Sequence, residues 1–282
     1  LLAIHGINLP EHLEQTLQPG GCMEVVRRWQ AEGRIGHVGF STHGPTALIA
    51  QACDSGAFDY VNLHWYYIRQ DNSPALDAAR RQDMGVFIIS PTDKGGHLHT
   101  PSQRLLELCA PLHPIVFNDL FCLQDPRVHT ISVGAARPED LELHLEALRL
   151  LPEAASLIAP VDQRLRQAAD EALGRDWMAT WSVGLPPWHA TPGEINLPVL
   201  LWLYNLLEAW ELESYAKARY GLLGSGGHWF AGANADGFED EVSVEELQSV
   251  LQESPWRERI PEILRSLKQR LKGESQMRLS SV

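Results

Sequence analysis

The chain has 282 residues, of which 44% are hydrophobic and 21% charged, and its formal net charge is −13. This composition is that of a folded protein with one or two domains. The negative charge argues against a nucleic-acid partner, which would require a basic face. No apolar run approaches the roughly 20 residues of a membrane span. The four cysteines are widely spaced and form no C-x-x-C pair, which indicates buried thiols and a cytoplasmic location.

Apolar, strand-prone segments alternate with amphipathic helix patterns over the first 150 residues. Strands are predicted at about 1–4, 33–40, 58–65, 85–89 and 128–133, and helices at about 22–32, 45–53, 73–82, 102–110, 114–123 and 138–150. This alternation predicts a parallel sheet covered by helices. Five units suffice for an open doubly wound sheet, but an eight-stranded barrel would need about three more units before residue 1. The chain starts within a strand pattern and without Met, so we expect that an upstream part is missing.

The pattern changes after about residue 151, where strand signals stop. Seven of the nine tryptophans lie beyond this point. Helices are predicted at about 160–173, 197–219, 243–252 and 257–272, a glycine-rich loop at 221–240, and disorder from about residue 273. Ser243 and Glu246 have the spacing of a capping box. We therefore divide the chain into a first part, residues 1–150, and a helical appendage, residues 151–282.

Each predicted strand runs into a short polar or glycine-rich loop. The clearest case is the segment from residue 33, in which Phe40 is followed by Ser41-Thr42-His43. Parallel α/β proteins place their chemistry at the carboxyl ends of the strands. The candidate functional residues are therefore those that follow the strands.

Five segments resemble, in order and spacing, the fourth to eighth strands of an aldo/keto reductase. They are Leu-Leu-Ala-Ile-His-Gly-Ile-Asn at the start, Gly-Arg-Ile-Gly-His-Val-Gly-Phe-Ser-Thr-His from residue 33, Tyr-Val-Asn-Leu-His-Trp-Tyr-Tyr from residue 60, Gly-Val-Phe-Ile-Ile-Ser-Pro-Thr-Asp-Lys-Gly-Gly from residue 85, and Ile-Ser-Val-Gly-Ala from residue 131. The resemblance covers about residues 1–150. It is strongest to a bacterial branch whose barrel is followed by a ferredoxin-like, iron–sulfur-binding tail, which the segment 193–198 also resembles.

This resemblance implies a (β/α)8 barrel of the TIM type, here represented by strands four to eight, that reduces a small carbonyl substrate with NADPH. His5 falls at the position of the family's catalytic His, whose imidazole N–H can bond a carbonyl oxygen as negative charge develops on it. The alternative is that His5 caps the strand end by bonding nearby backbone. The family's catalytic Tyr, Lys and Asp would lie on strands before residue 1.

The resemblance also implies a site for the nicotinamide carboxamide. Ser41 and Thr42 match the Ser-Asn pair that grips this amide, with Thr42 in place of the Asn. A threonine hydroxyl cannot offer both the donor and the acceptor of an amide. His64 stands where the family has a Gln for the same amide. All three could equally be ordinary polar residues at a strand end.

Two glycine-containing loops match the family's phosphate sites. Ser90, Lys94 and Gly95 lie in the loop that passes over the pyrophosphate, where backbone N–H groups and a lysine charge would face the ligand. Gly134 and Arg137 match the last phosphate site, where Arg137 could pair with a 2′-phosphate. The alternatives are a surface turn for the first loop and a solvated helix start for Arg137.

Two departures from the family weaken this reading. Leu143 and His144 replace the Glu-Asn that binds the adenine. Residues 123–282 contain no cysteine, so no iron–sulfur cluster is expected in the degenerate tail. We interpret His97, His99 and His228 as surface residues rather than metal ligands.

Three hypotheses remain from the sequence. The first is an NADP-dependent oxidoreductase of the aldo/keto reductase type. The second is an inactive descendant that acts as a binding or scaffold protein and docks a protein partner through the tryptophan-rich tail. The third is an open parallel sheet that folds alone, which would leave an unpaired edge at residues 1–4.

Overall fold

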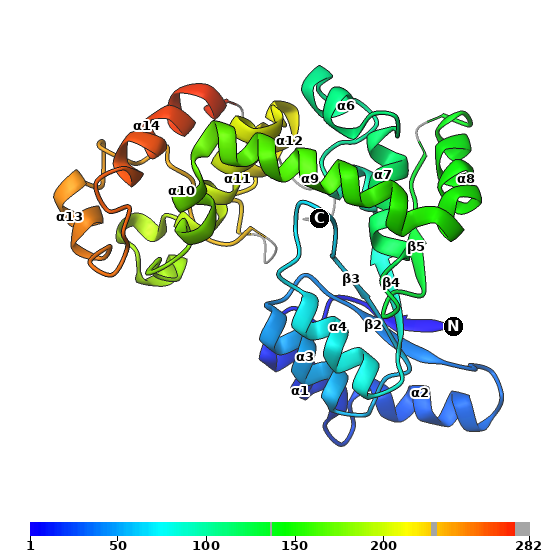
Figure 1. The fold of residues 1–282 in the computed structure, drawn as a ribbon. Coiled ribbons are helices and arrows are strands. Elements are labelled where there is room, and N and C mark those ends of the chain that lie inside the picture. The colour runs from blue at the N-terminus through cyan, green and yellow to red at the C-terminus, as the bar shows by residue number, and fades with distance from the viewer. Residues whose placement is uncertain (136, 227–229, 274–282) are drawn as a thin grey trace. The chain divides into compact units, whose positions relative to one another are not determined.

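The computed structural model describes residues 1–135, 137–226 and 230–273. The chain divides into two compact units (Figure 1). The first consists of residues 1–100 and 110–160, and the second of residues 101–109 and 161–282. Compared with the boundary drawn from the sequence at residue 150, segment 101–109 belongs to the second unit and segment 151–160 to the first.

The first unit contains one five-stranded sheet in which all neighbouring strands are parallel. Its strands are β1 (Leu2–Ile4), β2 (Val38–Ser41), β3 (Tyr60–Leu63), β4 (Gly85–Ile89) and β5 (Thr130–Ser132). They lie side by side in the order of the sequence, and β1 and β5 each pair with one neighbour, so the sheet is not closed among the described residues. Crossovers between parallel strands are right-handed, so strands that follow one another in sequence order have all their helices on one face, as in a barrel wall. In a doubly wound sheet the strand order reverses at one point, and helices cover both faces. The α/β prediction is confirmed, and the doubly wound alternative is wrong.

The helices of the first unit follow the strands in turn. They are α1 (Pro10–Leu17), α2 (Cys22–Ala31), α3 (Thr46–Asp54), α4 (Ser73–Arg81), α5 (Pro91–Lys94), α7 (Pro114–Leu123) and α8 (Asp140–Leu150), with a short 3-10 helix at Leu151–Glu153. The sequence analysis missed α1 and α5, which are short. It also began the second strand too early, since Gly33 adopts a positive φ of 72° in a turn and β2 starts only at Val38.

The core of this unit lies on one face of the sheet. Alternate strand residues point to this face, as the two-residue period requires: Val38, Phe40, Val61, Leu63, Val86 and Ile88, which belong to one buried apolar cluster with side chains of α1, α2, α3, α4 and α7. On the opposite face the Tyr60 ring lies over Gly39, where a Cβ would come within 2.5 Å of the ring. Gly39 is therefore required by this close approach.

The second unit is helical in its described part. Its helices are α6 (Gln103–Cys109), most of α9 (Ala154–Leu173), α10 (Arg175–Thr180), α11 (Leu197–Trp210), α12 (Glu213–Tyr220), α13 (Val244–Ser249) and α14 (Ile260–Leu271), with 3-10 turns at Trp188–Ala190 and Pro192–Glu194. The single helix predicted over 197–219 is wrong, because Glu211 takes a left-handed conformation (φ 55°) and ends α11. The capping box of Ser243 and Glu246 is confirmed.

Side chains of α6 and α9 bond the backbone of distant segments and hold α6 within the second unit. Ser102 Oγ and Arg104 Nε donate to the carbonyls of Trp210 and Ala209, at 2.8 and 2.9 Å. Arg164 Nε of α9 donates to the Leu108 carbonyl at 2.9 Å. A contact separated by about a hundred residues carries no local sequence signal, so the sequence analysis placed this helix in the first part.

The exposure of the cysteines and tryptophans departs in part from expectation. Cys53, Cys109 and Cys122 are buried, as expected, but Cys22 is exposed at the start of α2. Of the tryptophans described beyond residue 151, Trp177 is buried and the rest are half-buried: Trp181, Trp188, Trp202, Trp210 and Trp256. Burial raises the pKa of the Cys53 and Cys109 thiols to about 12, which makes them poor nucleophiles.

Within the described part of the chain, no single helix has the length and apolar character needed to cross a membrane. Only the bent pair formed by α6 and α7 meets that length and composition together.

The Arg127 guanidinium clamps the loop before β5 to α4. It donates to both carboxylate oxygens of Asp125, at 2.9 and 2.7 Å, and to Asp77 at 2.8 Å. Burial raises the pKa of the Asp125 carboxyl, but the hydrogen bonds and the charge of Arg127 lower it by a larger amount. The pKa of Asp125 is therefore below its ordinary value. A carboxyl with a lowered pKa stabilises the fold above its ordinary pKa of about 3.9, and this contribution is lost as the pH falls through the lowered pKa.

We therefore expect Asp125→Asn to lower the free energy of unfolding by about 1.5–3 kcal/mol at pH 7. The difference from the wild-type protein should shrink as the pH falls below about 4. Urea unfolding at several pH values measures this. Asp77→Asn, which changes the exposed partner of the same guanidinium, is the control and should cost less than 1 kcal/mol.

Candidate functional site

The polar residues that follow the strands come together at one edge of the sheet. Because all five strands are parallel and in register, their carboxyl ends share that edge. His5 follows β1, Ser41 ends β2, His64 follows β3 and Ser90 follows β4. The sequence-predicted residues of the first four strands therefore lie along a single edge.

His5 and Ser41 form a pair across β1 and β2. The Ser41 Oγ lies 3.0 Å from His5 Nδ1 and accepts the Gly6 backbone N–H at 3.2 Å. The Ser41 hydroxyl either donates to His5 Nδ1 or accepts from it, according to the tautomer of the ring. In the tautomer with the proton on Nε2, the serine O–H donates to Nδ1 and Nε2–H is a donor on this exposed residue.

A surface hollow of about 330 Å³ adjoins His5. It is lined by Ile4, His5, Gly6, Ile7, His12, Gln15, Thr16 and Cys22. Ligand pockets in proteins span about 300–1,000 Å³. The hollow therefore has room for a small molecule or for the reactive end of a larger one, but not for a whole dinucleotide.

Thr42 is buried and its hydroxyl is occupied by the protein itself. Its Oγ1 donates to the Ile7 carbonyl at 2.7 Å and accepts the Gly44 N–H at 2.9 Å. These bonds join the loop after β2 to the loop after β1. The side chain holds the edge of the sheet in shape and presents no polar atom to a carboxamide.

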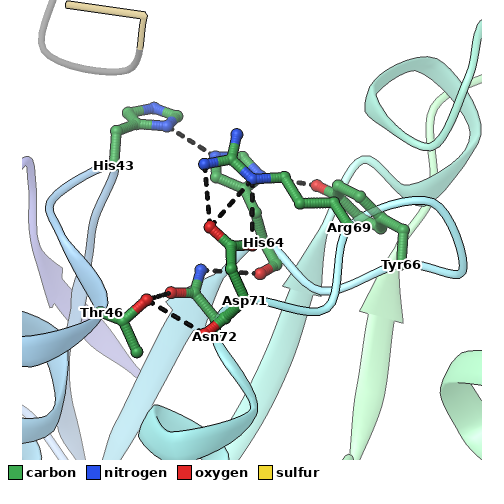
Figure 2. Close-up of polar contacts among 7 residues, drawn as sticks. All are labelled: His43, Thr46, His64, Tyr66, Arg69, Asp71 and Asn72. Atoms are coloured by element: carbon green, nitrogen blue, oxygen red, sulfur yellow. Dashed lines mark hydrogen bonds and ion pairs between the residues drawn. The ribbon is translucent and has the colours of Figure 1, made fainter. Parts of the chain in front are cut away.

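His64 lies in a hydrogen-bonded chain that sequence reasoning did not anticipate (Figure 2). Its Nδ1 is 2.5 Å from the Tyr66 hydroxyl, and its Nε2 is 2.6 Å from His43 Nδ1. The Tyr66 hydroxyl donates in turn to the Ile89 carbonyl at the end of β4. The chain thus crosses the carboxyl ends of β2, β3 and β4.

One end of this chain has a fixed hydrogen-bond direction. Since Tyr66 spends its only proton on the Ile89 carbonyl, its oxygen accepts from His64 Nδ1–H. The direction of the bond between His64 Nε2 and His43 Nδ1 depends on the protonation of the two rings. His43 is the half-exposed end of the chain, whereas His64 and Tyr66 are buried. The order Ser-Thr-His after one strand and His-Trp-Tyr after the next is the sequence signal that could have identified this chain.

The backbone around His64 is held by a second set of contacts. Asn72 Nδ2 donates to the His64 carbonyl at 2.8 Å, and Thr46 Oγ1 donates to Asn72 Oδ1 at 2.8 Å. Arg69 pairs with Asp71 at 3.1 Å in the same loop (Figure 2). The imidazole of His64 is therefore fixed from both its ring and its backbone, and it is not presented to a ligand.

Tyr66→Phe should lower the free energy of unfolding by about 2–4 kcal/mol. The change leaves the half-buried Ile89 carbonyl without its donor and the buried His64 Nδ1 without its acceptor, at about 1–2 kcal/mol for each group. Urea unfolding measures the loss, and the imidazole proton spectrum should show the His64 N–H signal shifting. Tyr60→Phe, the same atomic change on β3, is the control. An equal loss in both variants would contradict the role given to the chain.

The loop after β4 is held by its own backbone. Ser90 adopts a left-handed conformation (φ 47°, ψ 56°) ahead of α5. Gly95 is packed so closely that a Cβ would lie 2.0 Å from the Pro91 carbonyl oxygen. The Lys94 N–H donates to the Ser90 carbonyl, while the N–H groups of Gly95 and Gly96 point to the Asp93 carbonyl. The backbone donors predicted for a pyrophosphate are therefore engaged within the loop.

The last predicted phosphate site carries carboxylates. Asp140 begins α8, accepts the Arg137 backbone N–H at 2.9 Å and lies 3.5 Å from the Arg137 guanidinium. Glu139 and Glu142 flank the same helix start. A phosphate here would face negative charge, and Gly134 has open space around it rather than a close neighbour. The exposed Arg137 keeps its charge on the surface.

His144, predicted to stand at an adenine contact, is buried between α7 and α8. Its Nδ1 bonds the Asp119 carboxylate, whose pKa is raised by burial and partly lowered again by the hydrogen bond and charge of His144. Asp119 Oδ1 and His144 Nε2 have no further partner among the described residues. This pair joins two helices and is not accessible to an adenine.

In the described residues, no group of three or more His, Cys, Asp or Glu side chains is arranged to hold a metal ion. The prediction that His97 and His99 are surface residues is only half right, because both are half-buried. His97 lies 3.6 Å from Asp93, and His99 lies 3.6 Å from Asp140. His228 and residues 274–282 lie outside the described residues.

Comparison with known proteins gives similarity to solved structures alone. No protein-family model matches the sequence, and no curated protein matches it. The aldo-keto reductase AKR11C1 from Bacillus halodurans in its holo form is similar with a TM-score of 0.47 and 15% identity, over 58% of this chain and 58% of that chain. Its apo form is similar with a TM-score of 0.45 and 15% identity, over 58% of this chain and 61% of that one. The chain thus spans less than two thirds of the length of these structures.

Proposed function

We propose that the protein is an oxidoreductase of the aldo/keto reductase type, which transfers hydride between NADPH and a small carbonyl or alcohol substrate. The observation that carries the proposal is the His5–Ser41 pair at the carboxyl edge of the sheet, beside the hollow. His5 lines that hollow, and its Nε2-protonated tautomer offers an N–H donor there. We place the activity in the cytoplasm, since the four cysteines are unpaired.

In this proposal His5 orients the substrate. Its Nε2–H donates a hydrogen bond to the carbonyl oxygen, and the bond strengthens as negative charge builds on that oxygen. Ser41 bonds the ring at Nδ1 from the other side. NADPH would supply the hydride. The proton that the oxygen takes up comes from a separate donor, for which the resemblance implies a tyrosine.

The chain's own residues fit the cofactor only in part. Arg137 is exposed, but its guanidinium lies 3.5 Å from Asp140, and the Ser41 hydroxyl bonds His5 and the Gly6 N–H. Thr42 and His64 use their polar atoms inside the protein. Gly95 donates its N–H within its own loop. We therefore derive no step through the cofactor, and we expect it to bind this chain weakly.

A second candidate function follows from those same contacts. If the polar groups at the sheet edge serve only to hold the loops together, the protein is a non-catalytic descendant that binds a partner. Each predicted cofactor group that is engaged internally favours this candidate, and the tryptophan-rich second unit is where we propose that the partner docks.

Reductase assays on the full-length protein distinguish the two. We expect NADPH oxidation that depends on an added aldehyde, and a fall in kcat of about 100-fold in His5→Gln. His12→Gln, which changes another histidine that lines the hollow, is the matched control. Folded protein that oxidises no NADPH with any of a broad set of aldehydes would favour the non-catalytic candidate.

A further inference from the structure

Helix α8 buries two polar residues, whereas three of its five leucines are exposed. Asp140, His144 and Ala147 are buried, while Leu141, Leu145 and Leu148 are 46%, 45% and 54% exposed. Both sets have the i, i+4, i+7 spacing of one helix face. Large apolar side chains gathered on a surface are informative where a single exposed leucine is not.

The buried face of α8 contacts the first unit without these three leucines. α8 is held against the first unit by the bond of His144 to Asp119 on α7 and by the 3.6 Å contact of Asp140 with His99. The three exposed leucines are not part of the buried apolar cluster of the unit. Three of the eight most exposed large apolar side chains of the described residues lie on this one helix. Such a stripe is typical of an interface.

We propose that α8 packs against α8 of a second copy of this chain in an antiparallel pair, related by a two-fold axis near Leu145. In this register Leu145 meets its own counterpart, and Leu141 of each copy meets Leu148 of the other. A two-fold interface is self-complementary by construction. The leucine stripe is centred on the same residue as the proposed axis, as this symmetry requires.

The charges beside the stripe select the antiparallel direction. Glu142 and Arg149 are both exposed, and they lie on the same flank of the stripe, about two turns apart. Their midpoint also falls next to Leu145. An antiparallel two-fold keeps equal flanks on the same side, so each Glu142 faces the Arg149 of the other copy, and this pair occurs twice in the dimer. A parallel pair would place the two Glu142 residues on opposite sides, and neither would reach an arginine.

The oligomeric state of the 282-residue chain tests this proposal. Sedimentation velocity from about 1 to 200 µM, the range of weak interfaces, should show a monomer–dimer equilibrium. Leu145→Glu should raise the dissociation constant at least tenfold. Val25→Glu, which alters an exposed apolar residue on α2, is the matched control and should leave it unchanged.

Charge exchange tests the register and the direction of the helices. Glu142→Arg and Arg149→Glu should each weaken the dimer about threefold to tenfold, because each creates two like-charge pairs. The double variant should restore the dissociation constant to within about twofold of the wild-type value. A protein that stays monomeric over the whole range, a dimer insensitive to Leu145→Glu, or additive losses in the double variant would each overturn the proposal. Circular dichroism verifies that every variant is folded.

Discussion

Trp177→Ala is expected to lower the free energy of unfolding of the helical second unit by about 3–5 kcal/mol. Trp177 is fully buried, and its Nε1–H donates to Asn205 Oδ1 on α11 at 2.6 Å. The Trp256 ring packs edge-on against it with centroids 5.2 Å apart, and the Arg259 guanidinium lies 4.4 Å from its ring centre. Removing the indole leaves a cavity and an orphaned amide oxygen, and it leaves Arg259 with the more distant Trp256 ring, 5.6 Å from its guanidinium.

The measurement for Trp177 is urea unfolding combined with hydrogen exchange of the α10 and α11 amides. Trp177→Phe separates the two contributions, because it keeps a ring but removes the bond to Asn205. We expect it to cost clearly less than the alanine variant. A loss below about 1 kcal/mol for Trp177→Ala would mean that this indole does not organise the unit.

Phe40→Ala should have an equally large effect on the first unit, again about 3–5 kcal/mol. Phe40 is fully buried at the centre of β2, with Ile4 and Val61 as its register partners on either side. Its ring packs against Phe58 at 4.8 Å between centroids. Because the same strand ends at Ser41, loss of this contact also loosens the edge that carries the candidate site.

Hydrogen exchange of the β2 and β3 amides reports the loss directly. Phe40→Leu, which keeps most of the apolar volume, is the control and should cost less than about 1.5 kcal/mol. If Phe40→Ala left the protection of these strands unchanged, the account of the sheet face as the core of the unit would be wrong.

The parallel sheet could be predicted from the sequence because its signal is local. Each strand is a short apolar run such as Val86–Ile89, followed by a break and a helix pattern. The order of the strands in the sheet has no local sequence signal, so the sequence left the doubly wound alternative open. The structure decides it, because Phe40 pairs with Val61 and Val61 with Val86. The contacts of α6 with Ala209 and Trp210 were not local information either.

The candidate site was predictable in position but not in the state of its side chains. The sequence placed His5 and Ser41 at strand ends, and the structure brings them within 3.0 Å. The sequence does not predict that Thr42 and His64 are buried and bonded within the protein. Their partners, Ile7 and Tyr66, are brought to them only by the fold. A polar residue after a strand can face a ligand or fasten a loop, and the residue type is the same in both cases.

The central claim is that the carboxyl edge beside His5 binds a nicotinamide cofactor, and an NADPH titration followed by nucleotide fluorescence tests it most directly. We expect saturable binding that Ser41→Ala weakens about fivefold, the effect of losing one hydrogen bond of about 1 kcal/mol. Ser55→Ala, on the C-terminal side of α3, should leave the affinity unchanged. No saturable binding, or binding that Ser41→Ala does not weaken, would contradict the claim.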